Sequence, residues 1–235
     1  MKKLLIASTS TVHGKAYLEY ILPELSDFYK GVKEVLFIPY ARPSGLSHDE
    51  YTNRVKDAFQ KINMNVKGIH EFDSPIDAVN NAKGIFTGGG NTFLLVSQLY
   101  SHKLISVIKN VVENGIPYFG TSAGSVITGV TMQNTNDMPI IYPPSFNTLG
   151  LLNFNFNCHF LDPDPNSTHM GETRETRINE YHTINATPVL GLREGSWLRL
   201  NGQKVILKGK LNARLFQQNK QAVELAPETD FGFLM

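Results

Sequence analysis

Cysteine is almost missing from this 235-residue sequence, because Cys158 is the only one. An internal disulfide is therefore excluded, and with it the small secreted folds that disulfides stabilise; the composition suits a reducing, cytoplasmic location. Long apolar runs are missing too. The first run, residues 4–7, ends at Ser8 and is too short for the core of a signal peptide or for a membrane-spanning helix. We expect it to form the first strand of a sheet.

A surplus of either charge is also missing, since 22 Lys and Arg stand against 21 Asp and Glu, for a formal net charge of +1. No basic cluster stands out, so neither nucleic acid nor a membrane surface is an expected partner. The sequence shows no internal repeat, low-complexity tract or flexible linker. Its 41% of hydrophobic residues are enough for one sizeable core. We expect a single domain spanning residues 1–235.

Short apolar runs alternate with helical patterns in the first half of the chain. The predicted strands are residues 4–7, 35–39, 66–69, 85–87 and 118–120. Between them, Ser47 and Glu50 form a capping-box pattern, Ser74 precedes Pro75 as a helix start, and Gly115 follows a third helical stretch. This alternation predicts an α/β fold with a mostly parallel, doubly wound sheet of the flavodoxin-like kind, covered by helices on both faces.

The pattern changes after about residue 190, where short strands follow one another without helices. These are residues 189–192, 197–200, 205–207, 214–216 and 222–225, separated by turn signals such as Asn201-Gly202. They predict a C-terminal antiparallel extension. In open parallel sheets, active sites form beyond the carboxyl ends of the strands, so the loops after Ala7, Pro39, Thr87 and Gly120 are the places to examine.

The turn at residues 120–124 carries the motif G-x-S-x-G, with Ser122 at its centre. An apolar strand precedes the motif and a helical stretch follows it, which is the setting in which such a serine acts as a nucleophile. A glycine-rich turn with a solvated serine is the plainer interpretation. Ser125 is a competing hydroxyl, but three residues further on it should lie inside the helix.

Three successive glycines, residues 88–90, follow another predicted strand. Backbone N–H groups in such a loop can point to one place and bind phosphate or an oxyanion. Neither phosphate-binding pattern, G-K-[ST] or G-x-G-x-x-G, is present. A loop tightened only for packing is the alternative. With Ser122 one strand-and-helix unit away, we prefer an oxyanion hole in which the N–H of Gly90 pairs with that of Ala123.

His159 ends an apolar segment, residues 154–160, that is typical of a strand leading into a loop. Its neighbour Cys158 should point to the opposite face, which argues against a Cys–His pair. Two acids compete to orient the imidazole. Asp137 lies in a polar turn, and Glu194 directly follows a predicted strand. Chain order alone suits Asp137 in one hydrolase class, so the pattern leaves both open.

The segment 169–177 is dense in charge and allows three interpretations. The first is a solvated helix start with a Glu–Arg pair. The second is a metal site, for which the available side chains are His159, Asp162, Asp164, His169 and Glu172. No defined ligand spacing supports that site. The third makes Arg174 a fork for a substrate carboxylate, which the planar guanidinium suits.

Taken together, these motifs resemble the peptidase E family of serine peptidases, the α-aspartyl dipeptidases, which is related in fold to class I glutamine amidotransferases. The matching motifs are G-G-G-N-T-F at residues 88–93, T-S-A-G at 121–124, N-D-M-P-I at 136–140, H-F at 159–160, H-M-G-E-T-R-E-x-R-I at 169–178 and L-R-E-G-S at 192–196. They occur over nearly the whole chain and in this order.

The resemblance implies a serine dipeptidase that hydrolyses dipeptides with an unblocked N-terminal aspartate through an acyl-enzyme, without a cofactor or a metal. It implies roles for seven residues: Ser122 as nucleophile, His159 as general base, Glu194 as the preferred partner of His159, Asp137 as a second acid credited with charge relay, Gly90 and Ala123 as oxyanion donors, and Arg174 as the partner of the substrate aspartate. The expected binding partner is a small peptide substrate, and the expected oligomeric state is a monomer or a homodimer.

One departure from the family pattern lies beside the nucleophile, where Thr121 stands in place of the tryptophan that bacterial members often carry. It favours the alternative of a catalytically idle module that binds acidic small molecules. A second alternative is the related cyanophycin-degrading branch, which shares the serine but takes a polymer. The H-M-G-E-T-R match argues against that branch.

Overall fold

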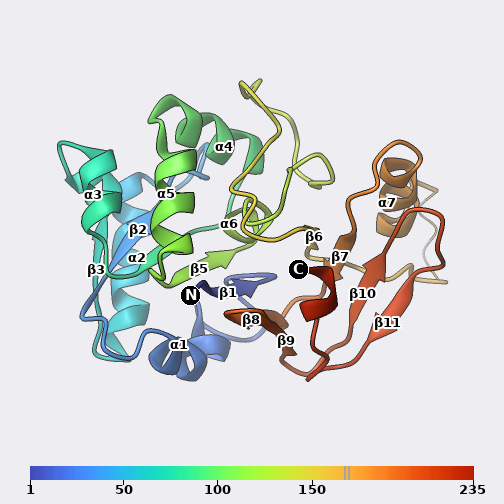
Figure 1. The fold of residues 1–235 in the computed structure, drawn as a ribbon, viewed down its shortest axis with the longest axis horizontal. Coiled ribbons are helices and arrows are strands. Elements are labelled where there is room, and N and C mark those ends of the chain that lie inside the picture. The colour runs from blue at the N-terminus through green and yellow to red at the C-terminus, as the bar shows by residue number, and fades with distance from the viewer. Residues whose placement is uncertain (167, 169) are drawn as a thin grey trace.

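The computed structural model describes residues 1–166, 168 and 170–235, and within them the strands form two sheets (Figure 1). In spatial order the larger sheet consists of β3 (Asn65–Gly68), β2 (Glu34–Ile38), β4 (Ile85–Thr87), β5 (Tyr118–Thr121), β1 (Lys3–Ala7), β8 (Trp197–Asn201) and β9 (Lys204–Lys208). The smaller sheet consists of β11 (Val223–Leu225), β10 (Ala213–Phe216), β7 (Val189–Leu192) and β6 (Asn155–Cys158).

The helices are α1 (Leu22–Phe28), α2 (His48–Gln60), α3 (Pro75–Asn81), α4 (Thr92–Ser101), α5 (Leu104–Glu113), α6 (Ala123–Val126) and α7 (Arg174–His182), with short 3₁₀ turns at Glu19–Ile21, Ile69–Glu71 and Gly232–Leu234. Side-chain caps begin four of the helices, α2, α3, α4 and α7. The capping box is present, because the Ser47 hydroxyl accepts from the Glu50 amide at 3.1 Å and the Glu50 carboxylate accepts from the Ser47 amide at 2.7 Å. The Ser74 hydroxyl caps α3 by accepting from the Asp77 amide at 3.2 Å. No helix of the described residues has the length and hydrophobicity that a bilayer crossing requires.

Helices cover both faces of the larger sheet. Leu5 and Ala7 of β1 pack with buried side chains of α1 and α2. Leu4 and Ile6, which alternate with them, pack with α3, α4 and α5 on the other face. The strands β3, β2, β4, β5 and β1 are all parallel. The predicted doubly wound α/β fold is therefore confirmed.

The C-terminal strands divide between the two sheets, a division the sequence pattern did not predict. Strands β8 and β9 extend the larger sheet in the antiparallel sense, which confirms the expected extension. Strand β7, however, pairs in parallel with β6 and antiparallel with β10, because short strands of similar composition do not reveal their partners. The smaller sheet is covered by α7, whose Ile178 packs on Val189 and Phe216 (Figure 1). One apolar cluster joins residues of both sheets.

The register brings the carboxyl ends of the parallel strands to one edge. Ala7 pairs with Thr121, Thr87 with Gly120, and Ile38 with Thr87. The loops after β1, β2, β4 and β5 therefore leave the larger sheet side by side. In the smaller sheet, the last residues of β6 and β7 are paired as well. Both loops from that pair continue towards the same edge.

Candidate active site

Ser122 forms the turn between β5 and α6. Its backbone angles, φ 50° and ψ −114°, lie in a region that residues other than glycine rarely adopt. Its amide donates to the carbonyl of Ala7 at 3.1 Å, and its carbonyl accepts from Ser125 and Val126. Hydrogen bonds on both sides thus hold the strained conformation, as expected of a nucleophile turn.

Small residues around Ser122 allow the turn to pack. A Cβ at Gly124 would lie 2.1 Å from the carbonyl oxygen of Thr87 in β4, so no larger residue fits there. Ser125, the competing hydroxyl, is fully buried. It donates to the carbonyls of Ala7 and Gly120 at 2.7 and 2.8 Å, which makes it a structural residue inside α6, as predicted.

His159 follows β6 and bridges the serine to an acid. Its Nε2 lies 2.8 Å from Ser122 Oγ, and its Nδ1 lies 2.6 Å from Glu194 Oε1. A carboxylate only accepts, so Nδ1–H donates to Glu194 and, in the neutral imidazole, Nε2 is left to accept the Ser122 hydroxyl proton. The side chains of His159 and Glu194 are 39% and 45% exposed, which leaves the pair open to a substrate.

Asp137 is not in contact with the imidazole. Its Oδ2 accepts from the backbone amide of Thr92 at 2.7 Å and from the Thr92 hydroxyl at 2.5 Å, at the start of α4. Of the two acids that the sequence left open, Glu194, the preferred one, is the acid that the imidazole contacts among the described residues. The sequence could not decide between the two because the parallel β6–β7 pair that brings Glu194 to His159 is a tertiary feature. Asp137 still lines the small cavity that Ser122 and His159 also line.

Ser8, which sequence reasoning missed, joins the two sheets behind the imidazole. Its hydroxyl donates to the carbonyl of Leu192 at 2.6 Å and accepts from the backbone amide of His159 at 2.9 Å. Ser8 is fully buried and directly follows β1. It therefore fixes the backbone of His159 and the end of β7 against the larger sheet. In the sequence, only the position of Ser8 at the end of a predicted strand pointed to a role in the site.

The triple-glycine loop after β4 lies against the serine. A Cβ at Gly89 would come within 3.0 Å of the Cβ of Ser122. Gly90 has φ 148° and packs so closely on Ala41 that a Cβ would lie 2.2 Å from its carbonyl oxygen. Within the described residues, the amides of Gly90 and Ala123 donate to no backbone carbonyl, so neither N–H group has a backbone acceptor.

Comparison with known proteins shows to which family this chain belongs. The model of Peptidase family S51 matches residues 4–208. The chain belongs to peptidase family S51. Peptidase E of Streptomyces coelicolor is 45% identical over 232 residues, which cover 99% of this chain and 94% of that protein. A probable alpha-aspartyl dipeptidase of Drosophila melanogaster is 46% identical over 237 residues, covering 100% and 98%. A solved peptidase structure from an acI-B1 actinobacterium shares the fold with a TM-score of 0.72, at 14% identity, over 98% of this chain and 96% of that one.

Arg174 of this S51 chain is the first residue of α7, where the Thr173 hydroxyl caps the helix by accepting from the Thr176 amide. Arg174 lines a cavity of about 370 Å³ that also includes Leu161 and shares no lining residue with the Ser122 cavity. Burial and the Arg177 cation lower the pKa of Arg174, and Asp137 opposes them.

Other side chains considered from the sequence have different partners. Glu172 pairs with Arg177 at 3.5 Å, as the first interpretation of this segment expected. Of the alternative metal ligands, Asp162 is bound by Arg193, and His169 lies outside the described residues. In the part of the chain that the structure describes, no group of three or more His, Cys, Asp or Glu side chains is placed to hold a metal. Burial raises the pKa of the Cys158 thiol, which therefore stays protonated beside His159.

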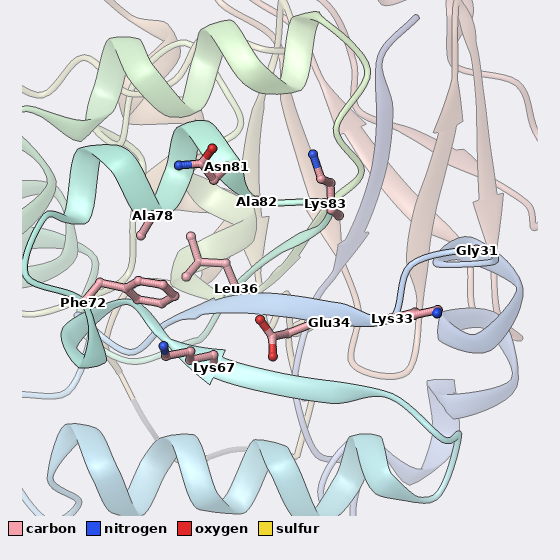
Figure 2. A pocket seen from close by; sticks show the side chains of 10 residues that line it. All are labelled: Gly31, Lys33, Glu34, Leu36, Lys67, Phe72, Ala78, Asn81, Ala82 and Lys83. Carbon is pink, nitrogen blue, oxygen red and sulfur yellow. The ribbon is translucent and has the colours of Figure 1, made fainter.

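A larger cavity of about 410 Å³ lies on the larger sheet, between β2, β3 and α3 (Figure 2). Its lining includes Lys33, Lys67 and Lys83. Figure 2 shows their ammonium groups pointing in different directions, and that of Lys67 lies over the Phe72 ring at 4.0 Å. The three cations therefore do not converge on one ligand position.

Arg193, next to Glu194, ties together the loops that carry the histidine and its acid. The guanidinium binds both oxygens of Asp162, which follows His159, at 2.8 and 2.6 Å. It also binds both oxygens of Glu224 at 3.0 and 2.9 Å. These charge-assisted hydrogen bonds lower the pKa of the Asp162 and Glu224 carboxyl groups.

We predict that Arg193→Gln lowers the free energy of unfolding more at pH 7 than at pH 3. Because the folded-state pKa values of Asp162 and Glu224 are depressed, their contribution is complete above their unfolded values, about 4, and is lost as the pH falls through the folded values. Urea unfolding of both proteins at the two pH values measures this. An equal difference at both would mean that the ion pairs add nothing to stability.

Proposed function

We propose that this chain is a serine-type α-aspartyl dipeptidase that hydrolyses dipeptides with a free N-terminal aspartate. The single observation that carries the proposal is the contact series Ser122–His159–Glu194, with distances of 2.8 and 2.6 Å. Full-length relatives at 45% and 46% identity, named peptidase E and probable alpha-aspartyl dipeptidase, support the substrate class. Thr121 is the one feature that favours the idle binding module, and no observation favours the cyanophycin-degrading alternative.

The proposed reaction begins when His159 Nε2 takes the proton of the Ser122 hydroxyl as Oγ attacks the carbonyl of the substrate aspartate. Glu194 holds the Nδ1–H and stabilises the imidazolium that forms. The oxyanion of the tetrahedral intermediate accepts from the amides of Gly90 and Ala123, each typically worth about 3 kcal/mol. His159 then protonates the leaving amine, and water hydrolyses the acyl-enzyme by the same route. This chemistry needs no cofactor.

Recognition of the first residue falls to two charged side chains. We assign the aspartate β-carboxylate to Arg174, a half-buried cation. We assign the substrate α-ammonium to Asp137. That ammonium is attached to the carbon next to the scissile carbonyl, so its partner must lie beside Ser122, as Asp137 does. Thr92 holds one oxygen of Asp137, which leaves the other for the substrate.

The finer expectations on partners and location belong to the same proposal. The proposed substrates are Asp-Xaa dipeptides, and the proposed oligomeric state of the enzyme is a monomer or a homodimer. The proposed location is the cytoplasm. The single, reduced cysteine supports that location.

We expect Ser122→Ala to lower kcat for Asp-Leu by about four orders of magnitude or more, because no other hydroxyl can form the acyl-enzyme. Steady-state kinetics on a panel of Asp-Leu, Glu-Leu, Asn-Leu and isoaspartyl-leucine measure activity and substrate class together. Circular dichroism should show an unchanged fold. Near-normal turnover in the variant, or a wild-type protein inactive on the whole panel, would exclude the proposal.

Arg174→Ala should remove the preference for aspartate at the first position. The expected effect is a fall of roughly 100-fold in kcat/KM for Asp-Leu, because the β-carboxylate loses its charged partner, with little change for Ala-Leu. Competition between the two dipeptides gives the ratio directly. A ratio equal to that of the wild type would remove Arg174 from the pocket.

Asp137→Asn should weaken recognition of the free amino group. We expect kcat/KM for Asp-Leu to fall by roughly 10- to 100-fold, mainly through KM, and discrimination against N-acetyl-Asp-Leu to shrink by a similar factor. The comparison of the two substrates in both proteins separates ammonium binding from catalysis. If kcat falls for both substrates while their ratio stays constant, Asp137 has another role.

A further inference from the structure

Arg42 lies at the same edge of the larger sheet and has no carboxylate partner among the described residues. It follows β2 in one of the loops that the sequence singled out. Its guanidinium lies over the Tyr51 ring, 4.8 Å from the centroid. Its Nε is shielded from solvent and finds no hydrogen-bond partner in the part of the chain that the structure describes. Among the ion pairs of the described residues, none includes Arg42. An N–H group that is shielded from water and lacks an acceptor is costly, and an anionic ligand would remove that cost.

The cavity that Arg42 lines has a volume of about 350 Å³ and an apolar side. Leu94, from the first turn of α4, and Ile140 and Ile141, which follow Asp137, form that side. His48 lines it too, and burial together with the neighbouring His70 lowers its pKa, so it is neutral at pH 7. Arg42 is thus the charged group in a lining that also includes three aliphatic side chains.

Asn91 connects this cavity to the nucleophile. The Asn91 amide donates to the carbonyl of Ala41, the residue before Arg42, at 2.7 Å. The Asn91 side chain donates to the carbonyl of Met138, just before Ile140, at 2.8 Å. The glycines that precede Asn91 contact Ser122 through Gly89 and Ala41 through Gly90. The same short loop therefore has the serine on one side and the Arg42 cavity on the other.

We propose that the Arg42 cavity binds the second residue of the dipeptide, with the guanidinium pairing its C-terminal carboxylate and the aliphatic side receiving its side chain. This inference rests on the proposed function and deepens it. An extended dipeptide spans only about 7 Å, so the carboxylate must be bound close to the scissile bond. A planar guanidinium is suited to that carboxylate. A longer peptide would place a neutral amide there, which explains a restriction to dipeptides.

The test compares two substrates that differ only in this charge, Asp-Leu and its amide Asp-Leu-NH2. The wild type should prefer Asp-Leu by roughly 10- to 100-fold in kcat/KM. Arg42→Ala and Arg42→Gln should lose most of that preference through a higher KM for Asp-Leu, with the rate on Asp-Leu-NH2 unchanged. Activity on the amide also shows that each variant is folded. Arg54→Ala is the matched control, because Arg54 lies over the Tyr17 ring at 4.9 Å in the same manner, and it should change neither rate.

Two outcomes would overturn the inference. Equal losses on both substrates would mean that Arg42 supports the fold or the chemistry, and an unchanged preference would mean that the carboxylate binds elsewhere. Both outcomes leave the proposed function standing, since the wild type still cleaves Asp-Leu. A wild type inactive on Asp-Leu and on Asp-Leu-NH2 would instead remove the proposed function, and this inference with it.

Discussion

The end of β1 holds the nucleophile and its base in one frame, and the rest of the site depends on that frame. The carbonyl of Ala7 accepts from the amide of Ser122, and the hydroxyl of the next residue, Ser8, accepts from the amide of His159. Two adjacent residues thus fix the backbones of the two reacting side chains, which come from different sheets. The 2.8 Å contact between Ser122 and His159 follows from these hydrogen bonds together with the side-chain conformations.

The same two residues also have strained backbones. Ser122 and His159 both have positive φ, 50° and 54°, although neither is glycine. Such conformations cost of order 1–3 kcal/mol each and persist only where the surroundings hold them. Here the sheet hydrogen bonds of β5 and β6 and the contacts to Ala7 and Ser8 do so. The positive-φ conformations turn both side chains away from their strands, towards the edge where the parallel strands of the larger sheet end. A substrate can reach them there.

Local sequence patterns predicted much of the fold but only part of the candidate site. The capping box at Ser47, the buried strands and the turn at Ser122 depend on neighbouring residues, so the sequence reveals them. Glu194 depends on the parallel pairing of β6 with β7, and Ser8 acts across the two sheets. Arg42 lay in a loop that the strand-end rule had marked, but only the structure shows it without an anionic partner. Contacts between distant segments have no periodicity in a single sequence.

The most direct test of the central claim is covalent labelling with a fluorophosphonate, an acylation mimic that reacts with serines activated by a histidine. Peptide mapping by mass spectrometry should find one adduct, on Ser122, with Ser125 unmodified, and His159→Ala should abolish the labelling. Modification of another residue, or labelling of Ser122 that persists without the imidazole, would contradict the account.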